Sequence, residues 1–270
     1  MRVSIVTISF NQAEFLEEAI LSVLEQDYED IEYIVVDAGS TDGSVSIIQK
    51  YAPRISNIIL EPDQGPADGL NKGFAVATGD IMGFLNADDL LLSHSITKLV
   101  KAFCLNSSAD VISGHALIID ESGNEIRRCY SDAYTALKAA YNAAFLMQPS
   151  TFFKANKFVA VGGFNVKNIS NWDGELWLDL YQEGASFLVI NEFLSCYRLT
   201  PSSITGSQRL DTLIRDFQKA KFEKVLKRKQ APFDIPIFWL LKTFRMLNNP
   251  KHLYQKILKG KVYGRRNTTT

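Results

Sequence analysis

The chain has 270 residues, of which 46% are hydrophobic and 11% aromatic, and its formal net charge is −1. This composition is typical of a globular protein with one large core, and it argues against a disordered chain. Three widely spaced cysteines, Cys104, Cys129 and Cys196, favour neither a disulfide framework nor a zinc site. The N-terminus lacks the pattern of a signal peptide, and no uncharged apolar stretch reaches the roughly 20 residues of a transmembrane helix. We therefore expect a reducing, cytoplasmic location.

The near-neutral total conceals two segments of opposite charge. From Arg209 to Thr270 there are 16 Lys and Arg against 4 Asp and Glu, whereas the preceding residues carry 13 basic and 26 acidic side chains. The only boundary signal lies in residues 200–208, which are rich in Ser, Thr, Pro and Gly. We predict an acidic body over residues 1–206 and a basic helical extension over residues 207–270.

The first ninety residues alternate between apolar β-rich runs and segments with the apolar spacing of helices. Strands are expected over residues 3–10, 33–36, 57–60 and 81–85. Each of these runs ends in polar or acidic residues, and helix-like sequence follows. This order predicts an α/β fold with a doubly wound, mostly parallel sheet, in which the polar strand ends meet at one ligand-binding edge.

The fourth strand ends in the most informative residues, Asn86-Ala87-Asp88-Asp89. Clustered carboxylates at the end of a buried strand carry a desolvation cost unless a cation or hydrogen-bond donors meet them. A divalent cation that holds a phosphorylated ligand would offset this desolvation cost. The alternative is that Asp88 and Asp89 start the helix expected over residues 93–104.

Seven sequence motifs follow one another along the body: VSIVTISFN, VVDAGSTDGS, EPDQGPADGLNKGF, GDIMGFLNADD, QPSTFF, VGGFN and WDGELWLDL. In this order they resemble the motifs of a family 2 glycosyltransferase, and the similarity covers roughly residues 1–205. The resemblance implies the GT-A fold and an inverting transfer of a sugar from a nucleotide diphosphate sugar, usually UDP-linked, to an acceptor hydroxyl. It also divides the body into a nucleotide-sugar-binding half, residues 1–90, and an acceptor-binding half, residues 91–206.

The resemblance assigns one group of residues to the nucleotide. These are Thr7, Ser9, Asn11, Asp37, Asp68, Lys72, Asn86 and Ala87. Asp37 is expected to accept a hydrogen bond from the base. Asp68 and Lys72 are four apart and would share one helix face, where a surface ion pair is the alternative. The turn after Asp37 is not GxGxxG, so a dinucleotide-binding fold has no direct support.

By the same resemblance, Asn86-Ala87-Asp88 occupies the position of the family's DXD motif, and Asp88 is the expected metal ligand. Hard oxygen ligands suit Mn²⁺ or Mg²⁺, which would stabilise the departing diphosphate. Asn86 replaces the usual first aspartate, which leaves metal affinity and nucleotide preference open. Asp89 is expected to support Asp88 or to cap the next helix.

The expected catalytic base is Asp173, in the string NWDGELW. An aspartate in a partly dehydrated, aromatic setting has a raised pKa, which suits a general base. The alternative role is an N-cap of the helix over residues 175–183. Further diphosphate or acceptor contacts are expected from Asp89, Arg198, Gln148, Gly163, Trp172 and Glu175. Arg198 could equally form an ion pair with a nearby acid, and Glu175 could be structural.

Two positions besides Asn86 depart from the family pattern. Gly174 stands where an aromatic residue is common, and Thr200 stands where many relatives have a histidine. These departures keep open a non-catalytic sugar-nucleotide-binding or scaffold protein of the same fold. A sugar-phosphate nucleotidyltransferase is a second rival, but it would need a Gly-rich, Lys- or Arg-bearing signature where this chain has Ser9-Phe10-Asn11.

In the extension, residues 233–247 are apolar and aromatic and are flanked by lysines and arginines. This pattern suits helices on an anionic membrane surface, where lipid-linked acceptors would be found. Packing on the acidic body, or a homodimer contact, are the alternatives, and nucleic-acid binding is not expected. The overall prediction is a metal-dependent inverting glycosyltransferase at the inner face of the cell membrane, acting in surface polysaccharide or glycolipid synthesis.

Overall fold

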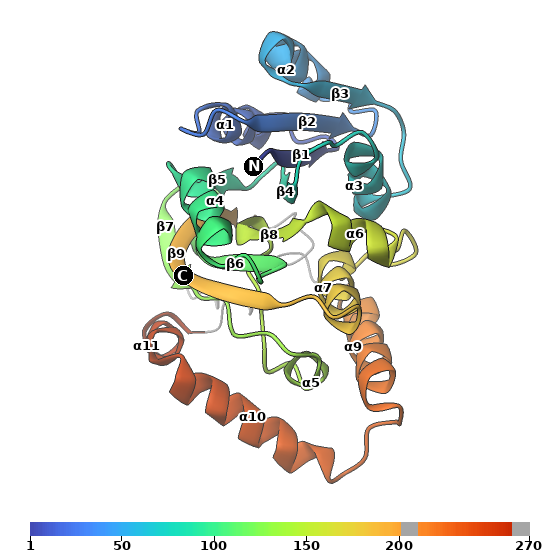
Figure 1. The fold of residues 1–270 in the computed structure, drawn as a ribbon, viewed down its shortest axis with the longest axis vertical. Helices are drawn as coiled ribbons and strands as arrows, with labels where there is room; N and C mark the ends of the chain where they lie inside the picture. Colours follow the sequence, from blue (N-terminus) through green and yellow to red (C-terminus); the bar gives the residue numbers. More distant parts are fainter. Residues whose placement is uncertain (201–209, 261–270) are drawn as a thin grey trace, which may run out of the picture.

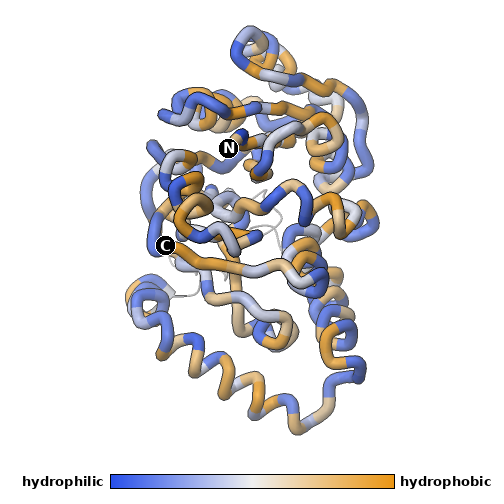
Figure 2. Tube along the Cα trace, in the orientation of Figure 1, coloured by the Kyte–Doolittle hydropathy of each residue, from blue (hydrophilic) through white to orange (hydrophobic). Residues whose placement is uncertain are grey.

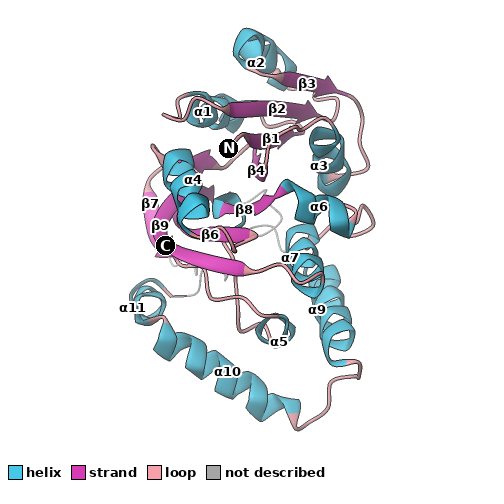
Figure 3. Ribbon diagram, in the orientation of Figure 1, coloured by secondary structure: helices cyan, strands magenta, loops and turns pink. Residues whose placement is uncertain are grey.

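The computed structural model describes residues 1–200 and 210–260 of the protein. A mixed β-sheet runs through the middle of the body, and helices cover both of its faces (Figures 1 and 3). Three helices from the basic extension follow the body and lie against one end of it (Figure 1). The expected boundary at residues 206–207 lies outside the described residues.

Four parallel strands form the first half of the sheet, in the order β3-β2-β1-β4. They are β1 (Val3–Ser9), β2 (Ile31–Asp37), β3 (Asn57–Leu60) and β4 (Ile81–Asn86). The connecting helices are α1 (Ala13–Leu24), α2 (Ser44–Tyr51) with the short η1 (Ala52–Arg54), and α3 (Pro66–Ala75). Apolar residues rich in Val and Ile fill β1, β2 and β4 because both faces of these strands are buried. The four expected strands are confirmed.

The second half of the sheet is mixed rather than parallel. Its elements are β5 (Leu90–Leu91), α4 (Ser95–Leu105), β6 (Val111–Ile119), β7 (Glu125–Cys129), α5 (Ala136–Ala140), η2 (Gln148–Ser150), β8 (Thr151–Lys154), α6 (Ala155–Val161), α7 (Trp172–Gln182) and β9 (Phe187–Arg198). Strand β8 joins β4 to β6 in antiparallel fashion, β9 runs parallel to β6, and β5 and β7 add antiparallel edges. The uninterrupted parallel pattern therefore ends at β4, and beyond it only the β6–β9 pair is parallel.

The capping roles considered for the acidic residues are wrong. The short strand β5 separates Asp88 and Asp89 from α4, whose N-cap is His94. In α7 the N-cap is Asn171, and Asp173 lies inside the first helical turn. None of the three aspartates is therefore needed to start a helix.

The two faces of the sheet bury two separate hydrophobic clusters. Alternate residues of β1 point to opposite faces, so Ile5 packs beneath α1, α2 and α4, whereas Val6 packs beneath α3, α6 and α7. Gly73 lets α3 approach the sheet closely, because a Cβ atom there would lie 2.5 Å from a methyl carbon of Val6. This close packing fixes the start of α3 beside the polar ends of β1 and β2.

The extension is helical, as expected, and packs on the body. It comprises α9 (Asp211–Leu226), α10 (Asp234–Asn248) and α11 (Pro250–Lys259). Phe222 of α9 is 1% exposed and lies edge-on to the ring of Tyr141. Hydrophobic segments recur along α10 in Figure 2. Among the described residues, no helix is long and apolar enough to cross a membrane.

Charge pairs join the basic extension to the acidic body. Lys224 of α9 forms an ion pair with Asp179 of α7, and the Arg245 Nε atom of α10 lies 2.7 Å from Asp132. Asp132 is only 8% exposed, and burial raises the pKa of its carboxyl group. Packing on the acidic body, one of the two alternatives to membrane contact, is therefore confirmed for this side of the extension.

Candidate active site

The polar ends of the parallel strands meet at one edge of the sheet, as their order in the sequence predicts. Ser9 pairs with Asp37 across β1 and β2, and Ile8 pairs with Asn86 across β1 and β4. The start of α3, with Asp68 in its first turn, follows β3 at the same edge. In open α/β sheets this edge is where ligands bind.

Ser9 and Asn11, two of the residues assigned to the nucleotide, lie at this edge of the sheet, and they differ in their hydrogen bonds. The Ser9 hydroxyl is buried and has no hydrogen-bond partner in the described part of the chain. A buried polar group without a partner is rare and suggests a missing ligand or water. Asn11 adopts a left-handed φ of 51°, and its Oδ1 atom accepts a bond from the Thr41 N–H.

Three further residues of this group are more enclosed. Thr7 is fully buried, and its hydroxyl accepts a hydrogen bond from Tyr33 at 3.0 Å. Asp37 is also fully buried, and its carboxylate accepts bonds from the Ser40 N–H and hydroxyl, both at 2.7 Å. Ala87 is 2% exposed and belongs to the core under α1 and α4. These contacts favour packing roles for Thr7 and Ala87, and they give Asp37 the role of fixing the turn after β2.

The start of α3 gathers acidic residues around one lysine. Asp68 and Lys72 share a helix face as predicted, with the Lys72 Nζ atom 3.9 Å from the Asp68 carboxylate. Asp63 lies beside them and was not singled out from the sequence. Burial raises the pKa of Asp63, and the negative charges of Asp68 and Asp37 add to the effect. Asp63 lies three residues after the end of β3, and Asp37 is the last residue of β2; this repeated acidic residue at a strand end is the signal that could have found Asp63.

A hydrogen-bonded network of Asn86, Gln148 and Asp89 closes the end of β4. The Asn86 amide nitrogen donates to Gln148 Oε1 at 3.2 Å and to Asp89 Oδ2 at 3.3 Å, and Gln148 donates to the Phe84 carbonyl at 2.9 Å. Gln148 and Asp89 are 7% and 1% exposed. Burial, followed by the charge of Asp88, raises the pKa of Asp89 well above its usual range. An asparagine at position 86 thus supplies donors that an aspartate lacks.

We expect Asn86→Asp to destabilise the metal-free protein by about 2 kcal/mol, because it removes both donors and places a third carboxylate beside Asp89. Added Mn²⁺ should recover part of this loss, since a ligand that binds the folded state stabilises it. Thermal unfolding in EDTA and in Mn²⁺ measures both effects. Asn86→Leu, which removes the donors without adding charge, is the matched control, and an Asn86→Asp variant as stable as wild type in EDTA would contradict the account.

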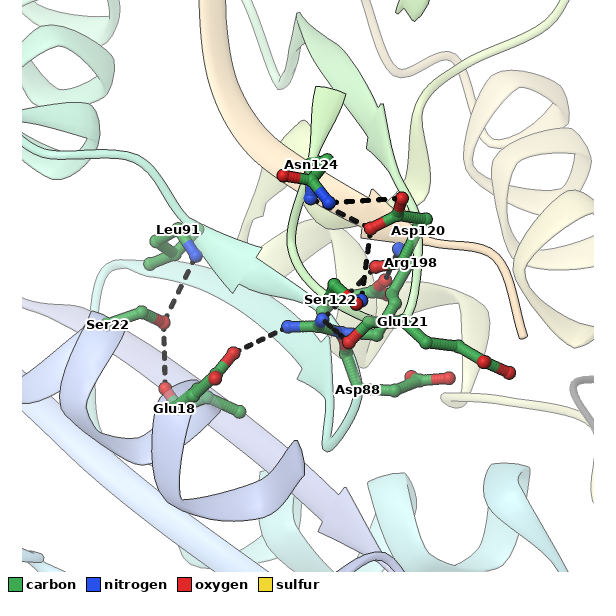
Figure 4. A network of polar contacts seen from close by, with 11 residues as sticks. Glu18, Ser22, Asp88, Leu91, Asp120, Glu121, Ser122, Asn124 and Arg198 are labelled. Carbon is green, nitrogen blue, oxygen red and sulfur yellow. Dashed lines mark hydrogen bonds and ion pairs between the residues drawn. The ribbon is translucent and has the colours of Figure 1, made fainter. Parts of the chain in front are cut away.

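Arg198, at the end of β9, holds the loop that carries Asp88 (Figure 4). Its side chain is 1% exposed. The guanidinium donates to the Asp88 carbonyl at 2.9 Å and to the Glu121 carbonyl at 2.9 Å, and it pairs with Glu18 of α1 at 2.6 Å. The guanidinium N–H groups thus donate to protein groups, and Arg198 positions the loop that carries Asp88. The ion pair considered from the sequence exists, with Glu18 as its acid.

The Asp88 carboxylate points away from this guanidinium network (Figure 4). Within the described residues, only the N–H of Asp88 itself donates a hydrogen bond to it, and burial raises its pKa. No group of three or more potential metal ligands exists in the described part of the chain. A divalent cation would therefore rest on Asp88 and take its other ligands from diphosphate oxygens and water, which is a usual arrangement for Mg²⁺. The residues present fit such a cation.

Asp173 lies in the first turn of α7 and is partly buried. Burial raises the pKa of its carboxyl group, and the Gly174 N–H, its own N–H and the charge of Lys221 oppose that rise. Lys221 comes from α9 of the extension, and its Nζ atom donates to Asn142 Oδ1 at 3.0 Å. Burial lowers the pKa of Lys221 to about 8, against the opposing charge of Asp173.

Lys221 was missed in the sequence because nothing local links the extension to residue 173. Tyr134 also lies near Asp173: burial, followed by the charge of Asp173, raises the pKa of the Tyr134 hydroxyl above its usual range. On the extension side, Phe217 lies close to α7, since a Cβ atom at Gly174 would be 3.9 Å from its ring. The base candidate is therefore enclosed by both the body and the extension.

Aromatic packing links the two halves of the site. Trp172, the neighbour of Asp173, is 8% exposed, and its ring centroid lies 5.4 Å from that of Phe84 in β4. Phe84 precedes Asn86 by two residues, so both side chains project on the same side of the strand. The start of α7 is thereby held against the end of β4, which brings together the strand that leads to Asp88 and the helix that carries Asp173.

Glu175 and Gly163 have structural roles in the contacts observed. The Glu175 carboxylate accepts bonds from Asn165 at 3.1 Å and from Asn168 at 2.7 Å, so it organises the loop before α7. Gly163 has a φ of +83°, and a Cβ atom there would lie 2.7 Å from Asn71 Oδ1. Glycine is thus required at this position by backbone conformation and by the close approach of α3.

Comparison with protein families gives a match to the model described as glycosyl transferase family 2, over residues 4–161. The chain is 34% identical over 152 residues to an uncharacterized glycosyltransferase from Nostoc, a match that covers 53% of this chain and 47% of that relative. The chain thus matches about half the length of that relative.

Two further relatives match over longer segments. A Bacillus subtilis glycosyltransferase named for teichuronic acid biosynthesis, TuaG, is 27% identical over 210 residues, covering 76% of this chain and 82% of its own. The Campylobacter jejuni GalNAc(5)-diNAcBac-PP-undecaprenol β-1,3-glucosyltransferase is 29% identical over 206 residues, covering 73% of this chain and 65% of its own.

Solved structures resemble the fold over nearly the whole chain. Residues 1–349 of S. aureus TarS, in complex with UDP-GlcNAc, match with a TM-score of 0.66 and 16% identity, covering 97% of this chain and 77% of that one. The mannosyltransferase PcManGT from Pyrobaculum calidifontis, in complex with GDP-Man and Mn²⁺, matches with a TM-score of 0.65 and 20% identity, covering 96% and 73%. These matches confirm the expected GT-A fold.

Proposed function

Because the chain belongs to glycosyltransferase family 2, we propose that it transfers a sugar from a nucleotide diphosphate sugar to an acceptor hydroxyl with inversion at the anomeric carbon. The observation that carries this proposal is the junction between β4 and α7. There, the Asp88 carboxylate accepts no hydrogen bond from any other described residue. Trp172 packs on Phe84 and so holds the helix that carries Asp173 against β4. The packing of β4 against α7 supports the proposal that Asp88 serves the diphosphate and Asp173 serves as the proton acceptor.

In the proposed mechanism Asp173 accepts the proton of the acceptor hydroxyl while the oxygen attacks the anomeric carbon. The new C–O bond forms on the face opposite the diphosphate, and the bond from the anomeric carbon to the diphosphate oxygen breaks. Asp88 would hold a divalent cation, which would supply positive charge to the departing diphosphate when bound. Arg198 fixes the backbone of Asp88, and the Asn86–Gln148 pair fixes the strand end.

The relatives and the solved structures support a proposal for the donor and acceptor classes. TarS is in complex with UDP-GlcNAc and PcManGT with GDP-Man, which supports a nucleotide diphosphate sugar as the donor. Our inference of a UDP-linked donor rests on the resemblance of the sequence motifs. TuaG is named for teichuronic acid biosynthesis, and the Campylobacter enzyme for an undecaprenol-linked acceptor. We therefore infer a saccharide or lipid-linked saccharide acceptor, used in surface polysaccharide or glycolipid synthesis at the inner face of the membrane.

The experiment that tests the proposed function screens nucleotide sugars by thermal stabilisation, with and without Mn²⁺, and then follows transfer from the best donor by NMR. A UDP-sugar should raise the melting temperature more in Mn²⁺ than in EDTA, since ligands stabilise the state they bind. The product should carry the inverted anomeric configuration. Retention of configuration, or the absence of stabilisation by any nucleotide sugar, would overturn the proposal, and binding without transfer would favour the scaffold alternative.

The acid limb of the pH–rate profile should report the pKa of Asp173. Because burial raises that pKa, activity should be lost at a higher pH than an ordinary aspartate would allow, as the base becomes protonated. Lys221→Met removes a positive charge that opposes the rise, so the limb should move to still higher pH. Lys219→Met, an exposed change two residues away, should leave the profile unmoved, and an identical shift in both variants would contradict the role of Lys221.

A further inference from the structure

Large apolar side chains are exposed on α10, on α11 and just before α10. Ten of them are at least 36% exposed, and they are Phe233, Ile235, Ile237, Trp239, Leu240, Phe244, Leu247, Tyr254, Ile257 and Leu258. Most soluble monomers scatter such residues singly, whereas contiguous patches mark a surface that binds a partner or a membrane. These residues lie on two consecutive helices, α10 and α11, and at the position just before α10.

On α10 the exposed residues form a stripe. Ile237, Leu240, Phe244 and Leu247 recur at intervals of three and four, which places them on one side of the helix. Leu240 and Leu247 are 66% and 68% exposed. We call this stripe, together with Trp239 at its margin, the outer face of α10.

The opposite side of α10 is fixed to the protein, so the outer face cannot fold onto the body. Asp234 accepts a hydrogen bond from Tyr141 at 2.6 Å and pairs with both terminal nitrogens of Arg228 at 2.7 Å. Leu241 packs on the cluster that contains Phe222. The outer face is therefore held outward by contacts on the other side of the same helix.

Within the described part of the segment that carries the outer face, the exposed charges are all positive. Residues 231–260 contain a single acidic residue, Asp234, and it is 2% exposed and paired with Arg228. Lys227, Lys229, Lys251 and Lys259 are exposed in and beside this segment. An anionic bilayer offers an apolar interior beneath a negative surface and fits both features. A second copy of the same face would bring lysines against lysines, which is unfavourable.

We propose that the outer face of α10, together with the exposed side chains of α11, binds the surface of an anionic lipid bilayer. The helix lies in the plane of the headgroups, with the apolar stripe inserted and the lysines among the lipid phosphates. Trp239 is 59% exposed and has the amphipathic ring that prefers this interface. One consequence rests on the proposed function. Helix α9 connects the membrane-bound α10 to Lys221 and Asp173, so a lipid-linked acceptor would reach Asp173 from the side of the extension.

The test uses the full chain and vesicles of phosphatidylglycerol and phosphatidylcholine in a one-to-two ratio, compared with phosphatidylcholine alone. The protein should co-sediment with the anionic vesicles and be released as salt increases. Trp172 and Trp177 are buried, so a blue shift of the tryptophan emission on vesicle addition would report the insertion of Trp239. The Leu240→Glu and Phe244→Glu double variant should bind at least about tenfold more weakly.

The matched control is the Leu105→Glu and Val159→Glu double variant, which adds two carboxylates at sites 73% and 72% exposed on the body. It should bind as wild type does, and circular dichroism should show equal folding of both double variants. Equal vesicle binding by the two double variants, or no binding by wild type, would overturn the proposal. The proposal would also be overturned if wild type did not bind vesicles but formed a concentration-dependent dimer that the Leu240→Glu and Phe244→Glu double variant abolished.

Vesicle binding should not depend on catalytic activity. Asp173→Asn, which removes the base, should bind vesicles as wild type does. Failure of the transferase assay with intact vesicle binding would therefore count against the proposed function alone, and intact transfer to a soluble acceptor without vesicle binding would count against the membrane surface alone.

Discussion

Asp173→Asn is expected to lower the rate of sugar transfer by about a thousandfold, because general-base catalysis contributes roughly 10²–10⁴ to such reactions. An amide fills the same space but cannot accept the acceptor proton. Donor binding should persist, since the proposed nucleotide edge lies at the ends of β1, β2 and β4 and at the start of α3, and Asp173 belongs to none of these elements. Initial rates with a saturating UDP-sugar, together with thermal stabilisation by UDP and Mn²⁺, separate the two effects.

The control for this variant is Asp179→Asn on the same helix. Asp179 is paired with Lys224 at the protein surface, so its loss should change the rate by less than about threefold. Equal activity of the Asp173→Asn variant and wild type would remove Asp173 from the mechanism. A loss of donor binding in the Asp173→Asn variant would show that the substitution acts through structure instead.

Arg198→Met is expected to destabilise the protein by about 3 kcal/mol, because it removes a buried guanidinium and leaves three partly buried hydrogen bonds to backbone carbonyls without their donor. The carbonyls concerned are those of Asp88, Asp120 and Glu121. The ion pair with Glu18 adds little, since the Glu18 side chain is 61% exposed. Thermal unfolding and the Mn²⁺ dependence of donor binding should both reveal the loss, because the loop that carries Asp88 is no longer held.

Arg2→Met is the control for the arginine variant, since Arg2 is 46% exposed and its distance to Asp30 is 3.8 Å. Its cost should be below about 0.5 kcal/mol. Arg198→Lys keeps the charge but loses the planar fork, and it should fall between wild type and Arg198→Met. An unchanged melting temperature in Arg198→Met would contradict the positioning role.

The parallel half of the fold could be predicted from the sequence because its signals are local. Each buried strand is a short apolar run rich in Val and Ile, and each ends in polar residues. The shared face of Asp68 and Lys72 followed from their spacing alone. The apolar character of residues 233–247 was also visible in the composition, although only the structure shows which side of α10 faces solvent.

The rest of the site depends on contacts between residues far apart in the chain, which no local pattern encodes. Gln148 reaches Asn86 across 62 positions, and Arg198 reaches Glu18 across 180. Lys221 approaches Asp173 only because α9 returns to the body after β9. The short strand β5 likewise forms only because β9 pairs with it, and α4 begins at Ser95 rather than at residue 93.

The most direct test of the central claim is a crystal structure of the Asp173→Asn protein with UDP and Mn²⁺. The account predicts the ion on the Asp88 carboxylate and on diphosphate oxygens, at the ends of β1, β2 and β4, with residue 173 facing the diphosphate across the space for the sugar. A diphosphate bound elsewhere, or residue 173 on the far side of the sheet from the nucleotide, would contradict it.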